Sequence, residues 1–156
     1  MKLSVAWKGV LCTLFLFLAS CSSKCQNWEV EEISSYYPCY STVKISLSPI
    51  DECFGIELQI VRSRCDTRMY ASIFGAPVYP SGCDESKVNM VVTIDDRSYP
   101  VLADRFRGGQ KFLVPEEISA EIVTALTNGV AVTISVGRYT SEIVPNNFLK
   151  CYKALN

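Results

Sequence analysis

The sequence contains no histidine. This absence excludes Ser-His-Asp and Cys-His catalysis in their usual forms, and it removes the commonest protein ligand of zinc and copper. No G-x-S-x-G motif, the usual setting of a hydrolase serine, occurs either. We therefore expect a protein that is not an enzyme, with no catalytic residues, no metal site and no cofactor.

The sequence also lacks a concentrated run of basic residues. The densest set, Arg62, Arg64 and Arg68, has Asp66 between its members, and the formal net charge of the chain is −1. Without residues 1–20, which carry two lysines and no acid, the charge becomes −3. A surface that binds nucleic acid needs a basic stripe, so we expect no nucleic-acid partner.

No hydrophobic run is long enough to span a bilayer. The longest covers residues 9–19 and is broken only by Thr13, about half of the ~20 residues that a membrane-spanning helix needs. Lys2 and Lys8 precede it, and small residues follow it. A positive start, a short apolar middle and small residues before a cleavage site are typical of a secretory signal peptide, predicted here over residues 1–20.

The end of this run, Leu18-Ala19-Ser20-Cys21, resembles the lipobox of bacterial lipoproteins at all four positions. The resemblance implies cleavage before Cys21, a diacylglycerol on its sulfur and an acyl group on its amine. Two or three acyl chains, at about 0.8 kcal/mol per buried CH₂, anchor a protein stably in a membrane. Ser22, in place of the aspartate that retains lipoproteins at the inner membrane, favours the outer membrane of the cell envelope. The alternative is an ordinary signal peptide cut nearby.

Six of the eight cysteines are left after Cys12 and Cys21 are set aside. An even number in an exported chain is typical of disulfides, and no pair among the six has the C-x-x-C spacing of metal or redox sites. Cys65 and Cys83 flank Gly75-Ala76-Pro77, a turn signal between two apolar runs. A hairpin there favours a Cys65–Cys83 disulfide. The six candidates are Cys25, Cys39, Cys53, Cys65, Cys83 and Cys151.

Beyond the signal peptide, the pattern predicts a lipidated N-terminus and short tether over residues 21–38 and one globular domain over residues 39–156. Alternation of apolar and polar residues predicts strands. One amphipathic helix is predicted near residues 115–128, because Pro115 suits a helix start and Asn128-Gly129 a helix end. The expected fold is mainly β, an antiparallel sheet or sandwich with this single helix, stapled by disulfides. Strands are predicted near residues 43–47, 56–61, 68–74, 88–94, 99–102, 112–114, 130–136 and 139–144.

The layout of about the last 70 residues (strand, Ile-Asp-Asp turn, strand, helix, strand and a closing segment from Phe148 to Leu155) is similar to that of small exported invasion-associated proteins of the locus B type. This resemblance implies a small exported β-rich domain and assigns no functional residue.

Two polar segments are candidate sites. Asp95-Asp96 is read as a turn rather than a catalytic pair, because adjacent strand residues point to opposite faces. In the loop 104–110, Arg105 and Arg107 flank Phe106 beside two glycines, an arrangement that binds anions or a partner's carboxylate. We expect a lipoprotein that binds or scaffolds another envelope protein. The alternatives are a small-ligand or anion-binding lipoprotein that uses this loop, and an envelope hydrolase.

Overall fold

A computed structural model describes residues 26–37, 41–51, 53–64 and 66–155. They form a nine-stranded, wholly antiparallel sheet in the order β1-β2-β3-β4-β7-β6-β5-β8-β9. The mainly β, antiparallel prediction is confirmed. The elements are β1 Glu29–Ile33, β2 Thr42–Leu47, β3 Ile56–Ser63, β4 Asp66–Ile73, β5 Lys87–Ile94, β6 Arg97–Arg105, β7 Lys111–Leu113, α2 Glu116–Thr127, β8 Val132–Val136, β9 Tyr139–Ile143, α3 Phe148–Tyr152 and the 3₁₀ helix η2 Lys153–Leu155.

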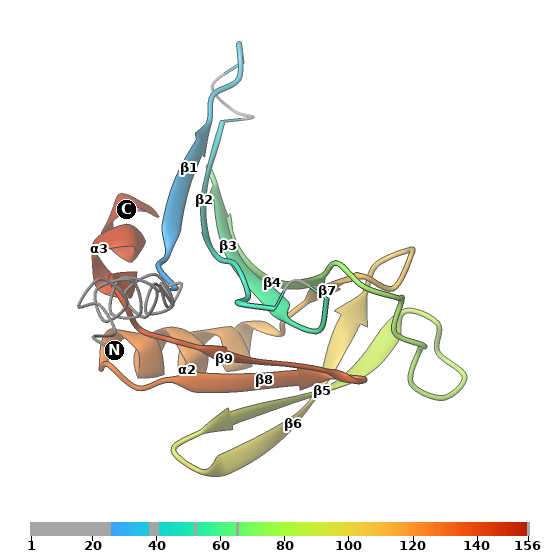
Figure 1. Ribbon diagram of the computed structural model, residues 1–156. Coiled ribbons are helices and arrows are strands. Elements are labelled where there is room, and N and C mark those ends of the chain that lie inside the picture. Colours follow the sequence, from blue (N-terminus) through green and yellow to red (C-terminus); the bar gives the residue numbers. More distant parts are fainter. Residues whose placement is uncertain (1–25, 38–40, 52, 65, 156) are drawn as a thin grey trace, which may run out of the picture.

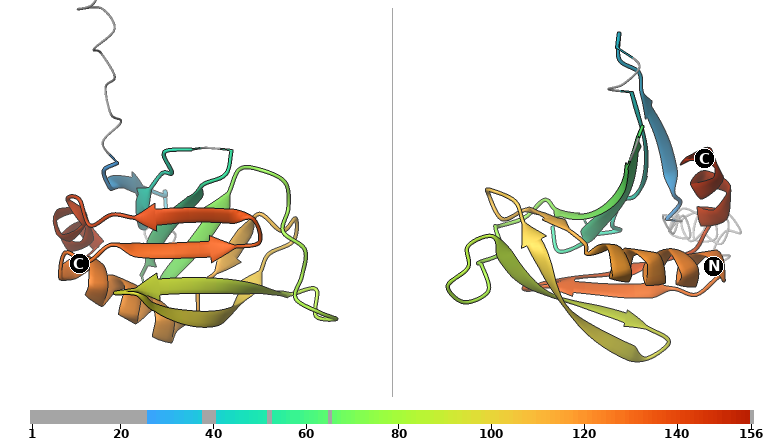
Figure 2. Two further views of the ribbon diagram at one scale, coloured as in Figure 1. Left: turned by 60° about the horizontal axis from the view of Figure 1, so that its bottom comes forward. Right: turned by 180° about the vertical axis from the view of Figure 1, so that it is seen from behind.

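The sheet is bent into two halves. β1–β4 stand in one half and β5, β6, β8 and β9 in the other, with the short β7 between β4 and β6 (Figure 1). Helix α2 lies on the inner side of the bend, as the view from behind also shows (Figure 2). The edge strand β9 returns against β3, where the Ile56 N–H donates to Ser141 Oγ at 2.7 Å. The core therefore fills the space enclosed by one sheet and its helix.

The strands follow the period-two pattern in the sequence. In β5, Val88, Met90 and Val92 are buried while Asn89 and Val91 are exposed. Hydrogen-bonded neighbours of β5 supply further core residues, since Met90 stands opposite Val136 and Val92 opposite Ile134 in β8. A one-residue slip would turn these side chains to solvent, so the buried face sets the register.

Helix α2 occupies the predicted range. Pro115 precedes it, Glu116 and Glu117 stand in its first turn, and the buried face consists of Ile122, Ala125 and Leu126. Gly129, at φ +79°, ends it, and the Val130 N–H then donates to Ala125 O at 2.9 Å. Glycine adopts this left-handed conformation without the strain that a side chain brings.

The predicted tether over residues 21–38 is wrong from Trp28 onward. Trp28 is a core residue, and β1 pairs with β2 along its whole length. Every residue of β1 is exposed, so the strand lacks the half-buried alternation that identifies a strand in a sequence. Residues 1–25, including Cys21 and Cys25, lie outside the described part of the chain.

The predicted disulfide staples are not supported. Cys53 and Cys83 are exposed free thiols and Cys151 is a buried one; Cys25, Cys39 and Cys65 lie outside the described residues. The hairpin proposed for a Cys65–Cys83 pair does not form, because β4 pairs with β3 and β7, whereas β5 pairs with β6 and β8. The segment containing Gly75 is a connection between the two halves of the sheet, so its turn signal was misinterpreted.

The C-terminal segment is held by packing and by hydrogen bonds to Trp28. The rings of Trp28 and Phe148 meet edge to face with centroids 4.9 Å apart, and the Trp28 indole N–H donates to Val144 O at 2.9 Å. Burial raises the pKa of the Cys151 thiol, which donates to Trp28 O at 3.3 Å. A second, short helix and this thiol contact thus replace the disulfide expected at Cys151.

Candidate functional site

The two arginines predicted as a binding pair have different positions. Arg105, at the end of β6, donates from Nε to Val78 O at 2.8 Å and from Nη1 to Glu85 O at 3.3 Å. Arg107 lies two residues further on, exposed in the turn before β7. Arg105 therefore positions the connection that follows β4, and the anion site expected from both residues stays a prediction.

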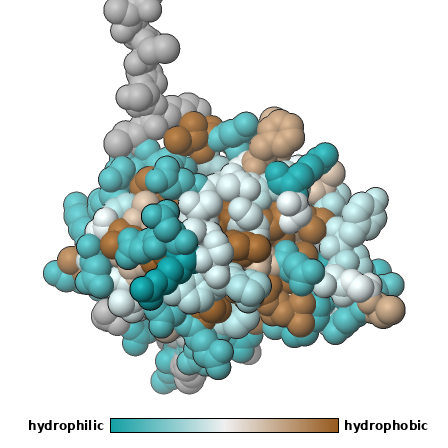
Figure 3. Space-filling model, turned by 90° about the horizontal axis from the view of Figure 1, so that it is seen from below, coloured by the Kyte–Doolittle hydropathy of each residue, from teal (hydrophilic) through white to brown (hydrophobic). Residues whose placement is uncertain are grey.

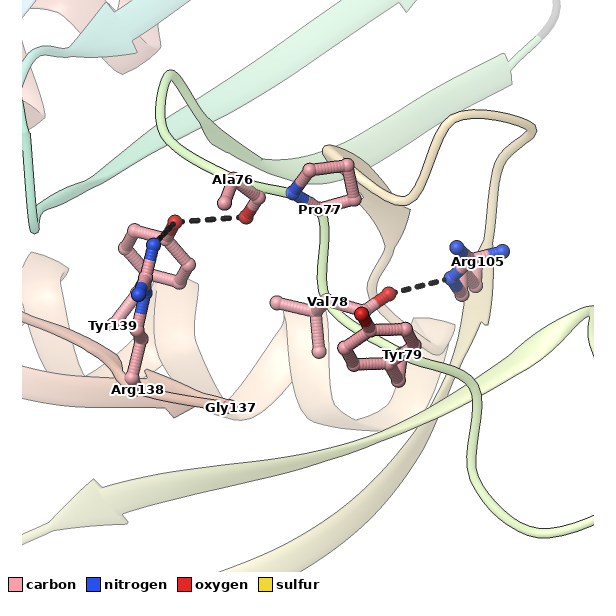
Figure 4. A pocket seen from close by; sticks show the side chains of 8 residues that line it. All are labelled: Ala76, Pro77, Val78, Tyr79, Arg105, Gly137, Arg138 and Tyr139. Atoms are coloured by element: carbon pink, nitrogen blue, oxygen red, sulfur yellow. Dashed lines mark hydrogen bonds between the residues drawn. The ribbon is translucent and has the colours of Figure 1, made fainter.

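The connection held by Arg105 forms one wall of a hollow with a volume of about 650 Å³. Figure 4 shows this hollow between the segment 76–79 and the turn that joins β8 to β9. The lining residues are Ala76, Pro77, Val78, Tyr79, Arg105, Gly137, Arg138 and Tyr139. They come from three segments that are far apart in the sequence and are brought together by the bend of the sheet.

Tyr139 supports one wall of the hollow. Its ring is buried, at 1% exposure, and its hydroxyl donates to Ala76 O at 2.7 Å while accepting from Arg138 Nη2 at 3.2 Å. A Cβ at Gly75 would collide with this hydroxyl, so the close approach requires glycine there. The tyrosine hydroxyl thereby fixes the distance between β9 and the segment 76–79.

Val78 closes the hollow from the opposite side. Its N–H donates to Gly109 O at 2.8 Å, and its side chain packs against the turn at Gly137. Gly137 has φ +58°, and a Cβ there would lie 3.1 Å from the Val78 methyl carbons. The small residue therefore combines a left-handed turn with close packing.

The charge of the hollow is positive. Its lining includes two arginines and no acid. Arg105 is engaged with two backbone oxygens, whereas Arg138 is exposed at the rim, with its guanidinium carbon 5.3 Å from the Tyr139 ring centroid. Tyr79, 88% exposed, stands at the other rim. Apolar walls with a cation at the edge suit an apolar ligand that carries a negative charge.

Two polar pairs that catalysis could use are engaged in other contacts. Asp95 and Asp96 form the turn between β5 and β6 with φ of 46° and 61°, so they are turn residues as predicted. Ser41 and Lys44 have the S-x-x-K spacing of some serine hydrolases, but Ser41 Oγ accepts the Ser35 N–H and Lys44 Nζ pairs with Glu31. Within the described ranges, no group of three or more Cys, Asp or Glu residues could hold a metal ion.

In the loop before β5, the Asp84 carboxyl accepts two hydrogen bonds from Ser86. Hydrogen bonds from the Ser86 hydroxyl, at 2.6 Å, and from its backbone N–H, at 2.9 Å, lower the pKa of the Asp84 carboxyl. Both groups are exposed, so this arrangement shapes the loop and forms no acid–base pair.

The sequence pattern predicted Arg105 as a site residue, but it gave no role to Arg138 and did not show that residues 76–79 and 137–139 meet. The sequence signal in this region, Gly75-Ala76-Pro77, was assigned to a hairpin turn. Comparison with known proteins adds no assignment: no family model, no curated protein and no solved structure matches the chain.

Proposed function

We propose that the protein is a lipid-anchored, non-enzymatic binding module of the bacterial envelope, held at the outer membrane through Cys21. The motif Leu18-Ala19-Ser20-Cys21 supports the anchor. The observation that carries the proposal is the closeness of this motif to the folded domain. Gln26 already contacts the fold, with its Nε2 donating to Ser48 O at 2.8 Å. Five residue steps separate it from Cys21, so the two Cα atoms are at most about 18 Å apart.

The intact mass of the protein purified from membranes tests the anchor. When the protein is expressed with its own signal segment, the purified chain should begin at Cys21 and carry the added mass of diacylglycerol and one further acyl chain. A Cys21→Ser variant should lose that mass and leave the membrane fraction. A chain that begins at Met1, that begins at Cys21 without acyl mass, or that is cut at another nearby bond contradicts the proposal. No described helix is long and apolar enough to cross a membrane.

The hollow lined by residues 76–79 and 137–139 supports the binding role. Its apolar walls and the exposed Arg138 favour a ligand or partner group that combines an apolar body with a negative charge. We propose that such a group belongs to another envelope component, and that Arg138 rather than Arg107 recognises its charge.

The probe 8-anilinonaphthalene-1-sulfonate, an apolar body with a sulfonate, tests this role. The folded protein should bind one equivalent with a rise in fluorescence. Arg138→Gln should weaken binding about tenfold, because a charge-assisted hydrogen bond contributes about 1.5–3 kcal/mol. Arg107→Gln is the matched control, since Arg107 is exposed but does not line the hollow, and should change the Kd less than about twofold. Absent binding, or equal losses in both variants, would contradict the proposal.

A further inference from the structure

Four strand ends meet at one end of the β1–β4 half. The register places Glu29 opposite Ser46, Leu47 opposite Leu58 and Ile56 opposite Ile73. The start of β1, the end of β2, the start of β3 and the end of β4 therefore lie together, as the ribbon shows (Figure 1). This is also where the chain enters the fold, because Gln26 contacts Ser48 just after β2.

Three large apolar side chains project from this end into solvent. Ile50 is 65% exposed, Phe54 is 56% exposed and Phe74 is 59% exposed. Ile50 and Phe54 belong to the connection between β2 and β3, and Phe74 follows β4 directly. We call these three residues the apolar end. Exposed aromatic and aliphatic groups concentrated at one end of a small domain indicate a contact surface.

Of the two acids in this connection, Asp51 is engaged locally, and Glu52 lies outside the described residues. Asp51 Oδ1 accepts the backbone N–H groups of Cys53 at 2.8 Å and Phe54 at 3.2 Å. The carboxylate thus shapes the turn that presents Phe54.

Another exposed set of apolar residues differs in its surroundings. On the outer face of β5 and β6, Val91 and Leu102 are 40% and 54% exposed. Figure 3 shows this side of the molecule, where hydrophobic side chains alternate with weakly polar and hydrophilic ones. Asn89 stands opposite Leu102 and Pro100 opposite Val91. This face belongs to the other half of the sheet from β1–β4, so it provides a control surface.

We propose that the apolar end contacts the bilayer in which Cys21 is anchored, with Ile50, Phe54 and Phe74 at the boundary between headgroups and acyl chains. This inference rests on the proposed lipid anchor. The chain from Cys21 to Gln26 reaches at most about 18 Å, and Ile50 follows two residues after the Ser48 carbonyl that binds Gln26. The proposed anchor therefore keeps this end of the domain within reach of the lipid. Partial removal of the three side chains from water then favours membrane contact.

Residues 22–156, without Cys21, test the contact separately from the anchor, since they include every described residue. This unlipidated chain should co-sediment with vesicles of phosphatidylethanolamine and phosphatidylglycerol. The triple variant Ile50→Ser, Phe54→Ser, Phe74→Ser should bind about tenfold more weakly. The control Val91→Ser, Leu102→Ser should bind like the parent. Circular dichroism should show that all three chains remain folded.

A depth measurement gives a second readout. In a Phe54→Trp variant, vesicles that contain brominated lipids should quench the added fluorescence. In a Leu102→Trp variant, they should not. Equal quenching at both positions, or equal vesicle binding by parent and triple variant, overturns the proposal.

Protein association is the competing outcome. In that outcome the parent chain fails to bind vesicles and sediments as a dimer, while the triple variant is a monomer. That result assigns the apolar end to contact with a second copy of the chain and overturns the bilayer contact. The mass of the Cys21 species is unaffected by any of these results, so failure of the contact and failure of the anchor are distinguishable.

Discussion

Replacing Trp28 by alanine should lower the free energy of unfolding by about 4 kcal/mol, in the range of 3–5 kcal/mol that truncation of a buried Trp or Phe costs. The side chain is 2% exposed and packs edge to face on Phe148. The variant also loses the indole hydrogen bond to Val144 O, leaving that carbonyl without this donor. Domains of this size are stable by about 5–15 kcal/mol, so this one change should remove a large share of the total.

Equilibrium unfolding in urea, followed by circular dichroism, measures the effect. Phe54→Ala is the matched control, because it truncates an aromatic side chain that is 56% exposed, and it should change stability by less than about 1 kcal/mol. A Trp28→Ala variant as stable as this control would show that the N-terminal segment does not belong to the core.

The second large effect is expected at Asn147, whose side-chain amide binds both backbone groups of Trp28. Its Oδ1 accepts the Trp28 N–H at 2.8 Å and its Nδ2 donates to Trp28 O at 3.0 Å. The residue has φ 51°, a left-handed conformation that asparagine tolerates better than alanine does. Asn147→Ala should therefore lose about 3 kcal/mol, from two hydrogen bonds at about 1 kcal/mol each and from backbone strain of about 1 kcal/mol.

Glycine separates these two contributions. Asn147→Gly loses both hydrogen bonds but adopts positive φ without strain, so it should be about 1 kcal/mol more stable than Asn147→Ala. The same urea titration compares them. Asn146→Ala, which removes an exposed hydrogen bond of 3.2 Å to Gln26 O, serves as the control and should change stability by less than about 1 kcal/mol. A glycine variant no more stable than the alanine variant would exclude strain at this position.

Local sequence signals predicted the helices and strands that have one buried face and one exposed face. β5 alternates between buried and exposed residues from Val88 to Val92, and α2 has a proline before it and a glycine after it. Both signals depend only on neighbours in the chain, so they can be read without knowing what each element contacts. The second half of the sheet was accordingly predicted strand by strand.

The rest depends on contacts between distant segments. β1 was missed because both of its faces are exposed. The pairing of β4 with β7, and hence the bend of the sheet, joins residues about forty positions apart, for example Tyr70 and Leu113. No local pattern encodes that choice. The hollow depends on the same bend, so no local pattern showed that Arg138 and Tyr139 lie beside the segment 76–79.

The contacts of Trp28 have a mechanical consequence. A pull on the N-terminal side of the chain reaches Asn147 and Cys151 before it reaches the ladder between β1 and β2. Hydrogen bonds of an edge strand open one after another when its end is peeled away, whereas the bonds around Trp28 must break together with the removal of its ring from the core. The contacts of Trp28 therefore have to break before β1 can be pulled away from β2. Under a pull from the N-terminal side, the domain resists unfolding more strongly at Trp28 than at the first hydrogen bonds of β1.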